Sequence, residues 1–299
     1  MKRVRAFVLA VTTALVALPA TPSGAASPPP SWQKIVKTLE PRLDPASKSP
    51  CNRGSVTCVD AVLKEMKRRE RAFAVKCNHN VMFSYTYRVT TEHVRSGWPR
   101  DFDSPAYIAH MDAIFAKSYF DAYDRWKDGG SGVSEAWTIA LDAARSKSVS
   151  GLGDMLLGIN AHISRDLPFV VEQVGLLGPD GSSALDDYNR FNQIIVETQG
   201  LALDGAARRF DPEVATVSIP GLVVGKDGLL ELFSAWRAEA WARAEQLVSA
   251  ATPEDRQAVV DEIEAIALAR ALLIQVGTAY VPFFSSTADR DEFCRDHRS

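Results

Sequence analysis

The sequence lacks the short motifs that mark the common catalytic classes. Its 299 residues contain no G-x-S-x-G nucleophile elbow, no P-loop, no G-x-G-x-x-G, no H-E-x-x-H and no haem-attaching C-x-x-C-H. Each of these motifs holds a nucleophile, a phosphate or a metal in a fixed local geometry. Nucleophilic serine hydrolysis and nucleotide chemistry are therefore not expected.

A strong excess of charge of either sign is also missing. The 34 Lys and Arg residues nearly balance the 37 Asp and Glu residues, and the formal net charge is -3. Nucleic-acid binding by counterion release needs a basic surface, so it is not expected. A hydrophobic share of 46% is typical of a globular protein.

Long hydrophobic runs are absent as well. The apolar run Ala6–Leu18 is shorter than the roughly 20 residues that a transmembrane helix requires. It follows the basic segment MKRVR and precedes small residues near Ala25 and Ala26, which is the pattern of a Sec-type signal peptide. We therefore expect residues 1–26 to be removed and the chain to be secreted, without a stable membrane anchor.

Cysteine is scarce, with four residues in the chain. In an exported protein an even number of cysteines indicates disulfides, and four cysteines allow three sets of pairings. We favour Cys51–Cys58, which closes a short loop, together with Cys77–Cys294, which ties the C-terminal tail to the body. Zinc ligation by cysteine is disfavoured because C-x-x-C spacing is absent.

Most of the remaining sequence has the periodicity of helices. Hydrophobic residues recur at helical spacing from residue 58 onward, and Ser104-Pro105 and Thr252-Pro253 have the form of helix starts. We predict an all-α fold, in which about seven to nine helices form one orthogonal or antiparallel bundle.

The predicted domain organisation is simple. Residues 27–57 form a proline-rich lead-in with the short disulfide loop, and residues 58–299 form the helical domain. The alternative is a mixed fold with a minor β element near residues 81–90 or 214–224, where β-branched and aromatic residues cluster.

Helical periodicity and reactive side chains coincide in GLGDMLLGINAHISRDLPF, residues 151–169. His162 and Asp166 are four residues apart, so their side chains can meet each other or a common ion. Pro168 lacks an amide hydrogen, and we expect the helix to end or kink just beyond Asp166. The pair can bind a divalent metal, act as a carboxylate-oriented general base, or form a buried hydrogen bond.

Two further residues are candidate metal ligands. Asp187 lies on the apolar face of ALDDYNRFNQII, where an unpaired carboxylate is costly. It either joins the His162–Asp166 pair or complements the dipole of its own helix. His110, on an aromatic-rich helix, is either a further ligand or a core residue.

Two arginines interrupt apolar helix faces. Arg270 is the candidate group for stabilising an anion that develops during catalysis, and Arg237 is the second choice. Either arginine can instead pair with a buried carboxylate, Asp166 or Asp187, or bind an anionic group.

The segment GDMLLGINAHISRDLPF, followed by DDYNRFNQII, resembles the signature of a mostly actinobacterial family of uncharacterised helical proteins. Members carry a similar N-A-H-I-x-x-D-L-P segment and a downstream D-Y-x-x-x-N. The resemblance covers about residues 58–280. The positions that match its pattern are Asn160, His162, Asp166, Pro168, Asp187 and Asn192.

A weaker similarity is to the secreted zinc-dependent phospholipase C and single-strand nuclease group, which is all-helical and uses H-x3-D ligand pairs. The three-metal site of that group takes several histidines and the mature N-terminal residue. This chain has five histidines and no matching N-terminal residue. The similarity therefore implies one or two divalent ions, zinc or a similar metal.

These observations predict a secreted metal-dependent hydrolase that acts on an ester or phosphoester in a small-molecule or lipid-like substrate. The metal lowers the pKa of a bound water, His162 and Asp166 take part in catalysis, and Arg270 stabilises the anion. The alternative is a non-catalytic secreted binding or structural protein whose His/Asp cluster is a buried polar network. A metal-free acid–base enzyme that uses the His162–Asp166 pair is the third hypothesis.

Overall fold

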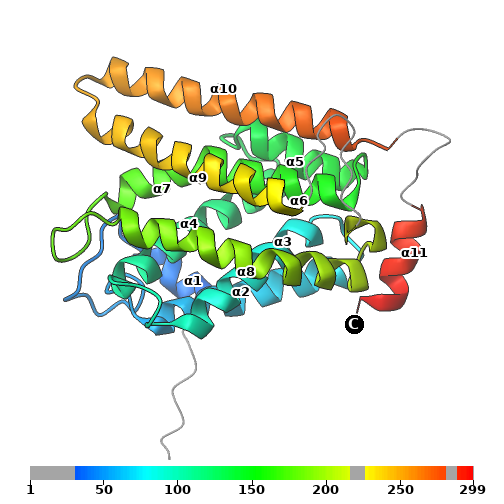
Figure 1. Ribbon diagram of the computed structural model, residues 1–299, viewed down its shortest axis with the longest axis horizontal. Coiled ribbons are helices and arrows are strands. Elements are labelled where there is room, and N and C mark those ends of the chain that lie inside the picture. The colour runs from blue at the N-terminus through cyan, green and yellow to red at the C-terminus, as the bar shows by residue number, and fades with distance from the viewer. Residues whose placement is uncertain (1–30, 216–225, 281–287, 299) are drawn as a thin grey trace, which may run out of the picture.

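The computed structural model describes residues 31–215, 226–280 and 288–298. Within these ranges the chain forms helices and no strand, which confirms the predicted all-α fold (Figure 1). None of these helices is both long and apolar enough to cross a membrane. The expected signal peptide lies outside the described residues. The elements are α1 (Trp32–Ile35), η1 (Val36–Thr38), α2 (Val56–Ala74), α3 (Val81–Gly97), α4 (Pro105–Lys127), α5 (Glu135–Ser146), α6 (Gly151–Asn160), η2 (Ala161–Asp166), α7 (Leu167–Val174), α8 (Leu185–Arg209), η3 (Pro212–Ala215), α9 (Lys226–Ser249), α10 (Pro253–Thr278) and α11 (Ala288–His297).

A continuous helical column formed by α6, η2 and α7 runs through the centre of the bundle. Helices α9 and α10 pack on one side of it, and α3, α4 and α5 pack on the others. In Figure 1, α10 follows the upper edge, α8 crosses the front, and α2 and α3 lie toward the lower edge. Nearly every residue of the column is buried, as expected for a helix that is covered all round.

Residues 81–90 are helical, so the β element predicted as an alternative at this position is wrong. They form the first turns of α3. Phe83 and Tyr85 are buried because α3 packs against α6 and α8. This tertiary packing outweighs the strand preference of β-branched and aromatic residues. The other β alternative, residues 214–224, lies mostly outside the described residues.

The central column continues through Pro168, which corrects the expected helix end or kink just beyond Asp166. The backbone widens into the π-helical turn η2, and the amide of Leu167 donates to the carbonyl of His162, five residues earlier. A wider turn gives the proline ring room that a regular α-helix lacks. Such turns are frequent at functional sites, and this one carries both His162 and Asp166.

Both favoured disulfides are formed, Cys51–Cys58 and Cys77–Cys294. The second joins residues that are 217 positions apart and fastens α11 to the rest of the bundle. Arg290 also holds α11, through a buried ion pair of 2.7 Å with a carboxylate of α6. The two disulfides indicate an oxidising environment for this protein.

Gly158 is required where the central column meets α3. A Cβ atom at this position would lie 2.4 Å from Cγ of Phe83. We therefore expect Gly158→Ala to lower the free energy of unfolding by about 1–3 kcal/mol, as measured by urea denaturation. Gly200→Ala is the matched control, because a Cβ at Gly200 in α8 meets nothing within 4 Å. The control should be neutral or stabilising, and an equal loss in both variants would contradict the close packing.

Candidate functional site

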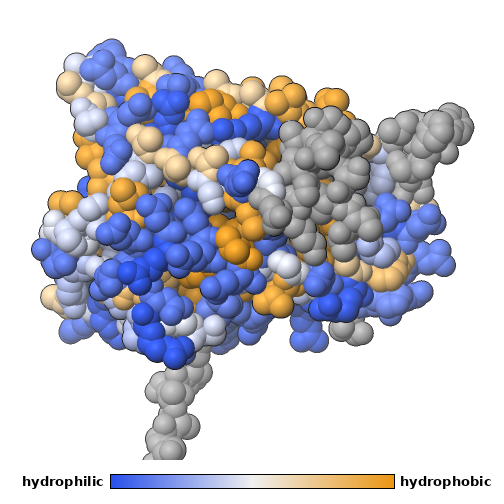
Figure 2. Space-filling view, in the orientation of Figure 1, coloured by the Kyte–Doolittle hydropathy of each residue, from blue (hydrophilic) through white to orange (hydrophobic). Residues whose placement is uncertain are grey.

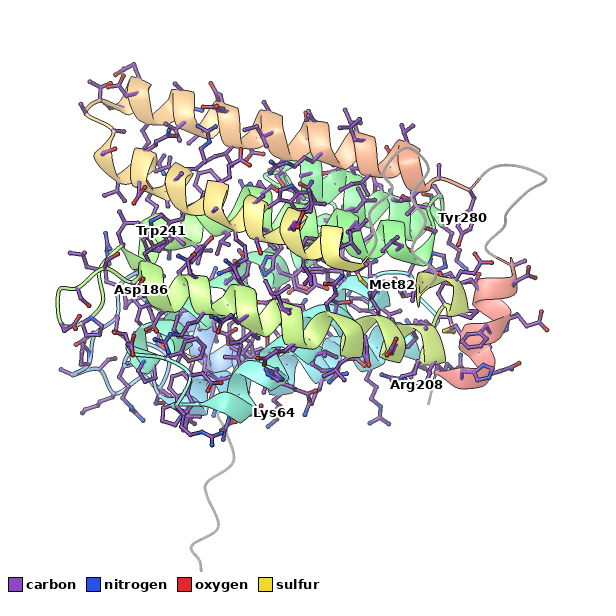
Figure 3. All side chains as sticks on the ribbon, viewed as in Figure 1. Lys64, Met82, Asp186, Arg208, Trp241 and Tyr280 are labelled. Carbon is purple, nitrogen blue, oxygen red and sulfur yellow. A yellow bond between two sulfur atoms is a disulfide. The ribbon has the colours of Figure 1, made fainter. Side chains whose placement is uncertain are left out.

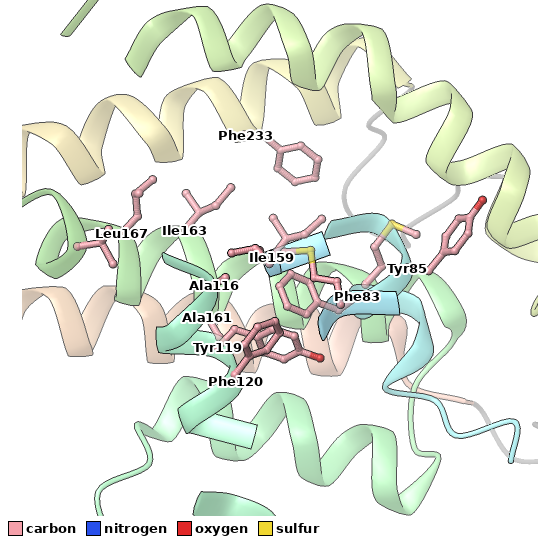
Figure 4. Close-up of a cluster of buried hydrophobic side chains, with 14 of the residues drawn as sticks. Phe83, Tyr85, Ala116, Tyr119, Phe120, Ile159, Ala161, Ile163, Leu167 and Phe233 are labelled. Atoms are coloured by element: carbon pink, nitrogen blue, oxygen red, sulfur yellow. The ribbon is translucent and has the colours of Figure 1, made fainter. Parts of the chain in front are cut away.

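The centre of the bundle contains an apolar cavity of about 110 Å³. Its wall is built from α3, α4, α8, α9 and the central column. Figure 4 shows Phe83, Ile159, Ile163 and Phe233 converging from different elements of this wall. Further apolar side chains in the wall include Met111, Phe115, Met155, Leu156, Phe191 and Leu203.

The cavity lies beneath the face that α8 and α9 form. These helices run side by side in Figure 1, and both contribute to the wall. Phe191 and Ile195 of α8 are part-exposed, whereas Phe233 of α9 is buried. Figure 2 shows apolar side chains reaching the surface between the two helices, with hydrophilic ones around them. We therefore expect access to the cavity from this face.

One end of the α8–α9 pair is packed by aromatic side chains. Trp241, labelled in Figure 3, lies between the two helices, and its ring centroid is 4.9 Å from that of Tyr188. The hydroxyl of Tyr188 donates to the carbonyl of Arg237 across 2.6 Å. These contacts join the start of α8 to α9 and fix the position of Arg237.

His162 lies in the cavity wall and has contacts on one ring face and at one ring nitrogen. Its ring is stacked on Phe115, with centroids 3.4 Å apart and planes 3° from parallel. Nδ1 lies 3.4 Å from Oδ2 of Asp166. Nε2 is buried and has no hydrogen-bond partner within the described part of the chain. His162 is therefore held by one face and one nitrogen, and its other nitrogen is free to meet a ligand.

Asp166 orients this imidazole. Its Oδ2 accepts a hydrogen bond of 2.9 Å from Nε1 of Trp137, and its Oδ1 accepts one of 3.1 Å from Arg165. Burial acts to raise the pKa of Asp166, but the contacts with His162, Arg165 and Trp137 outweigh it, so that the pKa lies below its ordinary value. The carboxylate is therefore ionised and accepts a hydrogen bond from the N–H group at Nδ1 of His162.

The imidazole itself is neutral. Burial lowers the pKa of His162 below its ordinary value, although the carboxylate of Asp166 partly opposes this. With its proton on Nδ1, the neutral ring has a lone pair on Nε2. The cavity wall thus offers a strong hydrogen-bond acceptor at His162.

Two other polar atoms of the wall have no partner among the described residues: the hydroxyl of Tyr87 and Oδ2 of Asp112. Asp112 is 5% exposed, and burial raises the pKa of its carboxyl to about 7. Burial likewise raises the pKa of the Tyr87 hydroxyl. At neutral pH a substantial fraction of Asp112 is protonated, so both residues can donate a hydrogen bond.

Arg237 is the cationic residue among the described residues of the wall. Only 3% of it is exposed, and burial lowers the pKa of its guanidinium. Its Nε donates to Oδ1 of Asn192 across 2.9 Å, and Nη2 donates to the carbonyl of Tyr188 across 2.7 Å. Within the described residues no carboxylate lies within 4.0 Å of it. The salt bridge that the sequence offered as an explanation for Arg237 is therefore not formed.

Two of the four candidate metal ligands lie apart from the His162–Asp166 pair. Asp187 accepts hydrogen bonds from the amides of Asp103 and Ser104, at 2.8 and 2.6 Å, and so caps the start of α4. The ring nitrogens of His110 lie 3.0 Å from the carbonyl oxygen of Cys51 and 3.1 Å from that of Pro41. The expected cluster of His162, Asp166, Asp187 and His110 is thus corrected to a pair, because other contacts hold Asp187 and His110.

Arg270 also has other partners than those expected. Its guanidinium donates to Glu239 across 2.5 Å and to the hydroxyl of Ser164 across 3.0 Å. It therefore pairs with neither Asp166 nor Asp187 and does not line the central cavity. Across the described ranges, no group of three His, Cys, Asp or Glu side chains could hold a metal ion. These residues do not fit the metal centre that the sequence predicted.

Tyr87 and Asp112 were missed by the sequence analysis. The sequence contains a signal for Asp112, which stands inside the apolar run AYIAHMDAIFA, where a carboxylate is unusual. Tyr87 belongs to the segment whose helical or strand character was ambiguous, so its facing could not be derived. That both residues share a cavity with His162 depends on the packing of three helices.

Comparison with known proteins gives a family and no activity. Residues 59–276 match the family described as "Family of unknown function (DUF5995)". This match supports the expected relation to an uncharacterised family and does not extend to the phospholipase C and nuclease group. No curated protein and no solved structure matches the chain.

Proposed function

The chain belongs to the DUF5995 family of unknown function, and we propose that it is a binding protein for a small, largely apolar molecule. The observation that carries this proposal is the apolar cavity, whose wall holds three buried polar atoms without a hydrogen-bond partner among the described residues. They belong to Tyr87, Asp112 and His162. The ligand has an apolar body and one group that forms hydrogen bonds with these atoms.

The energetic argument favours a ligand over a purely structural role. A buried polar atom without a partner costs about 1–3 kcal/mol, and three in one cavity cost several times that. A bound molecule that forms hydrogen bonds with these atoms removes this cost. A cavity of about 110 Å³ is somewhat smaller than the roughly 150 Å³ that suffices for benzene. The enclosed part therefore fits an aromatic ring or a short aliphatic chain, and a longer molecule extends between α8 and α9.

The site of action is proposed to be extracellular. The expected signal peptide and the two disulfides both favour export. Metal-dependent hydrolysis stays a prediction, and it is not part of this proposal because the four candidate ligands do not converge. The binding hypothesis instead gives the His162–Asp166 pair a role: the carboxylate orients an imidazole that receives a hydrogen bond from the ligand.

The proposal predicts saturable binding of benzyl alcohol by the mature, oxidised chain in isothermal titration calorimetry. Toluene, which has the same ring and no hydroxyl, should bind about five- to tenfold more weakly, because it leaves the polar atoms unsatisfied. Tyr87→Phe removes one hydroxyl at nearly constant volume and should reduce this preference.

The control for the position of the site is Ile159→Phe, which fills the cavity from the central column. It should abolish binding of both compounds while far-ultraviolet circular dichroism remains helical. Absence of saturable binding in the unaltered chain, or unchanged binding in Ile159→Phe, would overturn the proposal.

A further inference from the structure

Arg237 distinguishes this cavity from an ordinary apolar pocket. An arginine stays protonated in proteins, and a buried charge without a counter-charge is costly. Here the guanidinium is 3% exposed, lines the cavity, and has no carboxylate within salt-bridge distance among the described residues. Its hydrogen bonds within the described residues, to Asn192 and to the Tyr188 carbonyl, are with neutral acceptors.

The surroundings of Arg237 hold the guanidinium in place and do not neutralise it. Its Cζ lies 4.2 Å from the ring centroid of Tyr188 and 5.3 Å from that of Phe191. Two hydrogen bonds and two aromatic rings therefore define its position. An arginine has five N–H donors, and these two bonds use two of them, so that donors remain for an anion.

The other ionisable residues in the described part of the wall form no ion pair with Arg237. Asp112 lies on α4 and forms no ion pair with Arg237. His162 is neutral, and its neighbour Asp166 pairs with Arg165. The remaining wall near Arg237, from α8 and α9, includes Phe191, Ile195 and Phe233, which are apolar. A positive charge in an apolar cavity is complementary to an amphipathic anion.

We propose that the ligand of this cavity is an apolar carboxylate, whose carboxylate group pairs with Arg237 and whose hydrocarbon body occupies the cavity. This inference rests on the proposed binding function and names the class of its ligand. Carboxylate is favoured because a guanidinium binds it through two parallel hydrogen bonds. The part of the ligand that reaches inward meets the acceptor and donors at His162, Tyr87 and Asp112.

The experiment compares probes with the same eight-carbon chain: octanoate, methyl octanoate, 1-octanol and octylamine. Calorimetry on the mature, oxidised chain at pH 6.0, where Asp112 is mostly protonated, should give octanoate an affinity about 10- to 100-fold higher than those of the ester and the alcohol. Octylamine should bind more weakly than 1-octanol, because its positive charge is repelled by Arg237. These comparisons need no variant, so a folding defect cannot obscure them.

Two variants then locate the charge effect. Arg237→Gln should remove the preference for octanoate over 1-octanol, expressed as the ratio of their dissociation constants. Arg237→Lys keeps the charge and should retain part of the preference. As a matched control, Arg270→Gln removes a cation that lies outside the cavity and should leave the preference unchanged.

The failures of the two proposals are distinguishable. If 1-octanol binds as tightly as octanoate, or if Arg237→Gln folds and keeps the preference, the carboxylate inference is overturned and the binding function stands. If none of the probes binds the unaltered chain, both proposals are overturned.

Discussion

Replacing Cys77 and Cys294 together by alanine is expected to lower the free energy of unfolding by about 5 kcal/mol. A disulfide stabilises mainly by limiting the unfolded chain, and the effect grows with the length of the loop that it closes. This bond joins residues 217 positions apart, so it constrains most of the chain. Urea denaturation of both forms under oxidising conditions measures the loss.

The second disulfide provides the matched control. Cys51 and Cys58 are separated by 7 positions in the sequence, so their disulfide closes a short loop. The same loop-closure argument gives a loss of only about 2 kcal/mol when both are replaced by alanine. Equal losses in the two double variants, or a larger loss for the short loop, would contradict the entropic account.

Features that depend on neighbours in the sequence could be predicted from it. Helix α4 begins at Pro105 as expected, and α10 begins at Pro253 with the Thr252 hydroxyl accepting from the amide of Asp255 across 3.0 Å. Proline at the first helical position and a capping hydroxyl act within one turn, so these signals need no tertiary information. The His162–Asp166 contact is of the same kind, since the two residues are four apart on one helix.

Features that depend on which helices meet could not be predicted. The sequence placed Asp187 on an apolar face, where a carboxylate needs a partner. Its partners are the amides at the start of α4, with Nε of Arg190 3.7 Å away, and not the metal ion that the sequence predicted. Arg237 also needed a partner, and no carboxylate supplies one among the described residues. Helical periodicity predicts that a charged side chain is buried. It does not predict the hydrogen-bond partner of that side chain, because the partner lies on another helix.

The candidate site illustrates the same limit. His162 was identified because it interrupts an apolar helix, yet the cavity beside it arises from side chains of α3, α4, α8 and α9. A single sequence gives the facing of each helix and not the angle at which two helices cross. An internal cavity depends on those crossing angles. Neither the cavity nor the polar residues in its wall could therefore be predicted from the sequence.

Asp112→Asn is expected to stabilise the protein at alkaline pH, by roughly 4 kcal/mol at pH 8. Burial raises the pKa of Asp112 from 3.8 to about 7, and no hydrogen-bond partner for its Oδ2 lies among the described residues. An aspartate at this position must therefore be ionised in an apolar environment when the pH is high. Asparagine has nearly the same shape and no charge, so it avoids that cost.

The sign of the effect follows from proton linkage. In the folded protein Asp112 binds its proton up to about pH 7, whereas in the unfolded chain it releases it near pH 3.8. Between these values the folded state binds more protons, so the contribution of Asp112 to stability falls as the pH rises and is fully lost above about pH 7. The difference between Asp112→Asn and the unaltered chain should therefore be small at pH 4 and grow to its full size at pH 8.

Urea denaturation at pH 4, 6 and 8 measures this difference. Asp186→Asn is the control, because it makes the same substitution at an exposed aspartate, at the start of α8 (Figure 3). It should change the free energy of unfolding by less than about 0.5 kcal/mol at each pH. If Asp112→Asn instead destabilises the protein at pH 8, Asp112 has a stabilising partner, and its place among the unsatisfied atoms of the cavity is wrong.

The same variant connects stability with binding. Polar groups that destabilise the folded protein are typical of binding sites, and Asp112 is such a group at pH 8. Asp112→Asn should therefore gain stability and lose affinity for benzyl alcohol. The protonated carboxyl donates a hydrogen bond through an O–H group, whereas the amide donates through a weaker N–H group. A variant that gains stability and binds unchanged would separate Asp112 from the ligand and leave Tyr87 and His162 as its polar contacts.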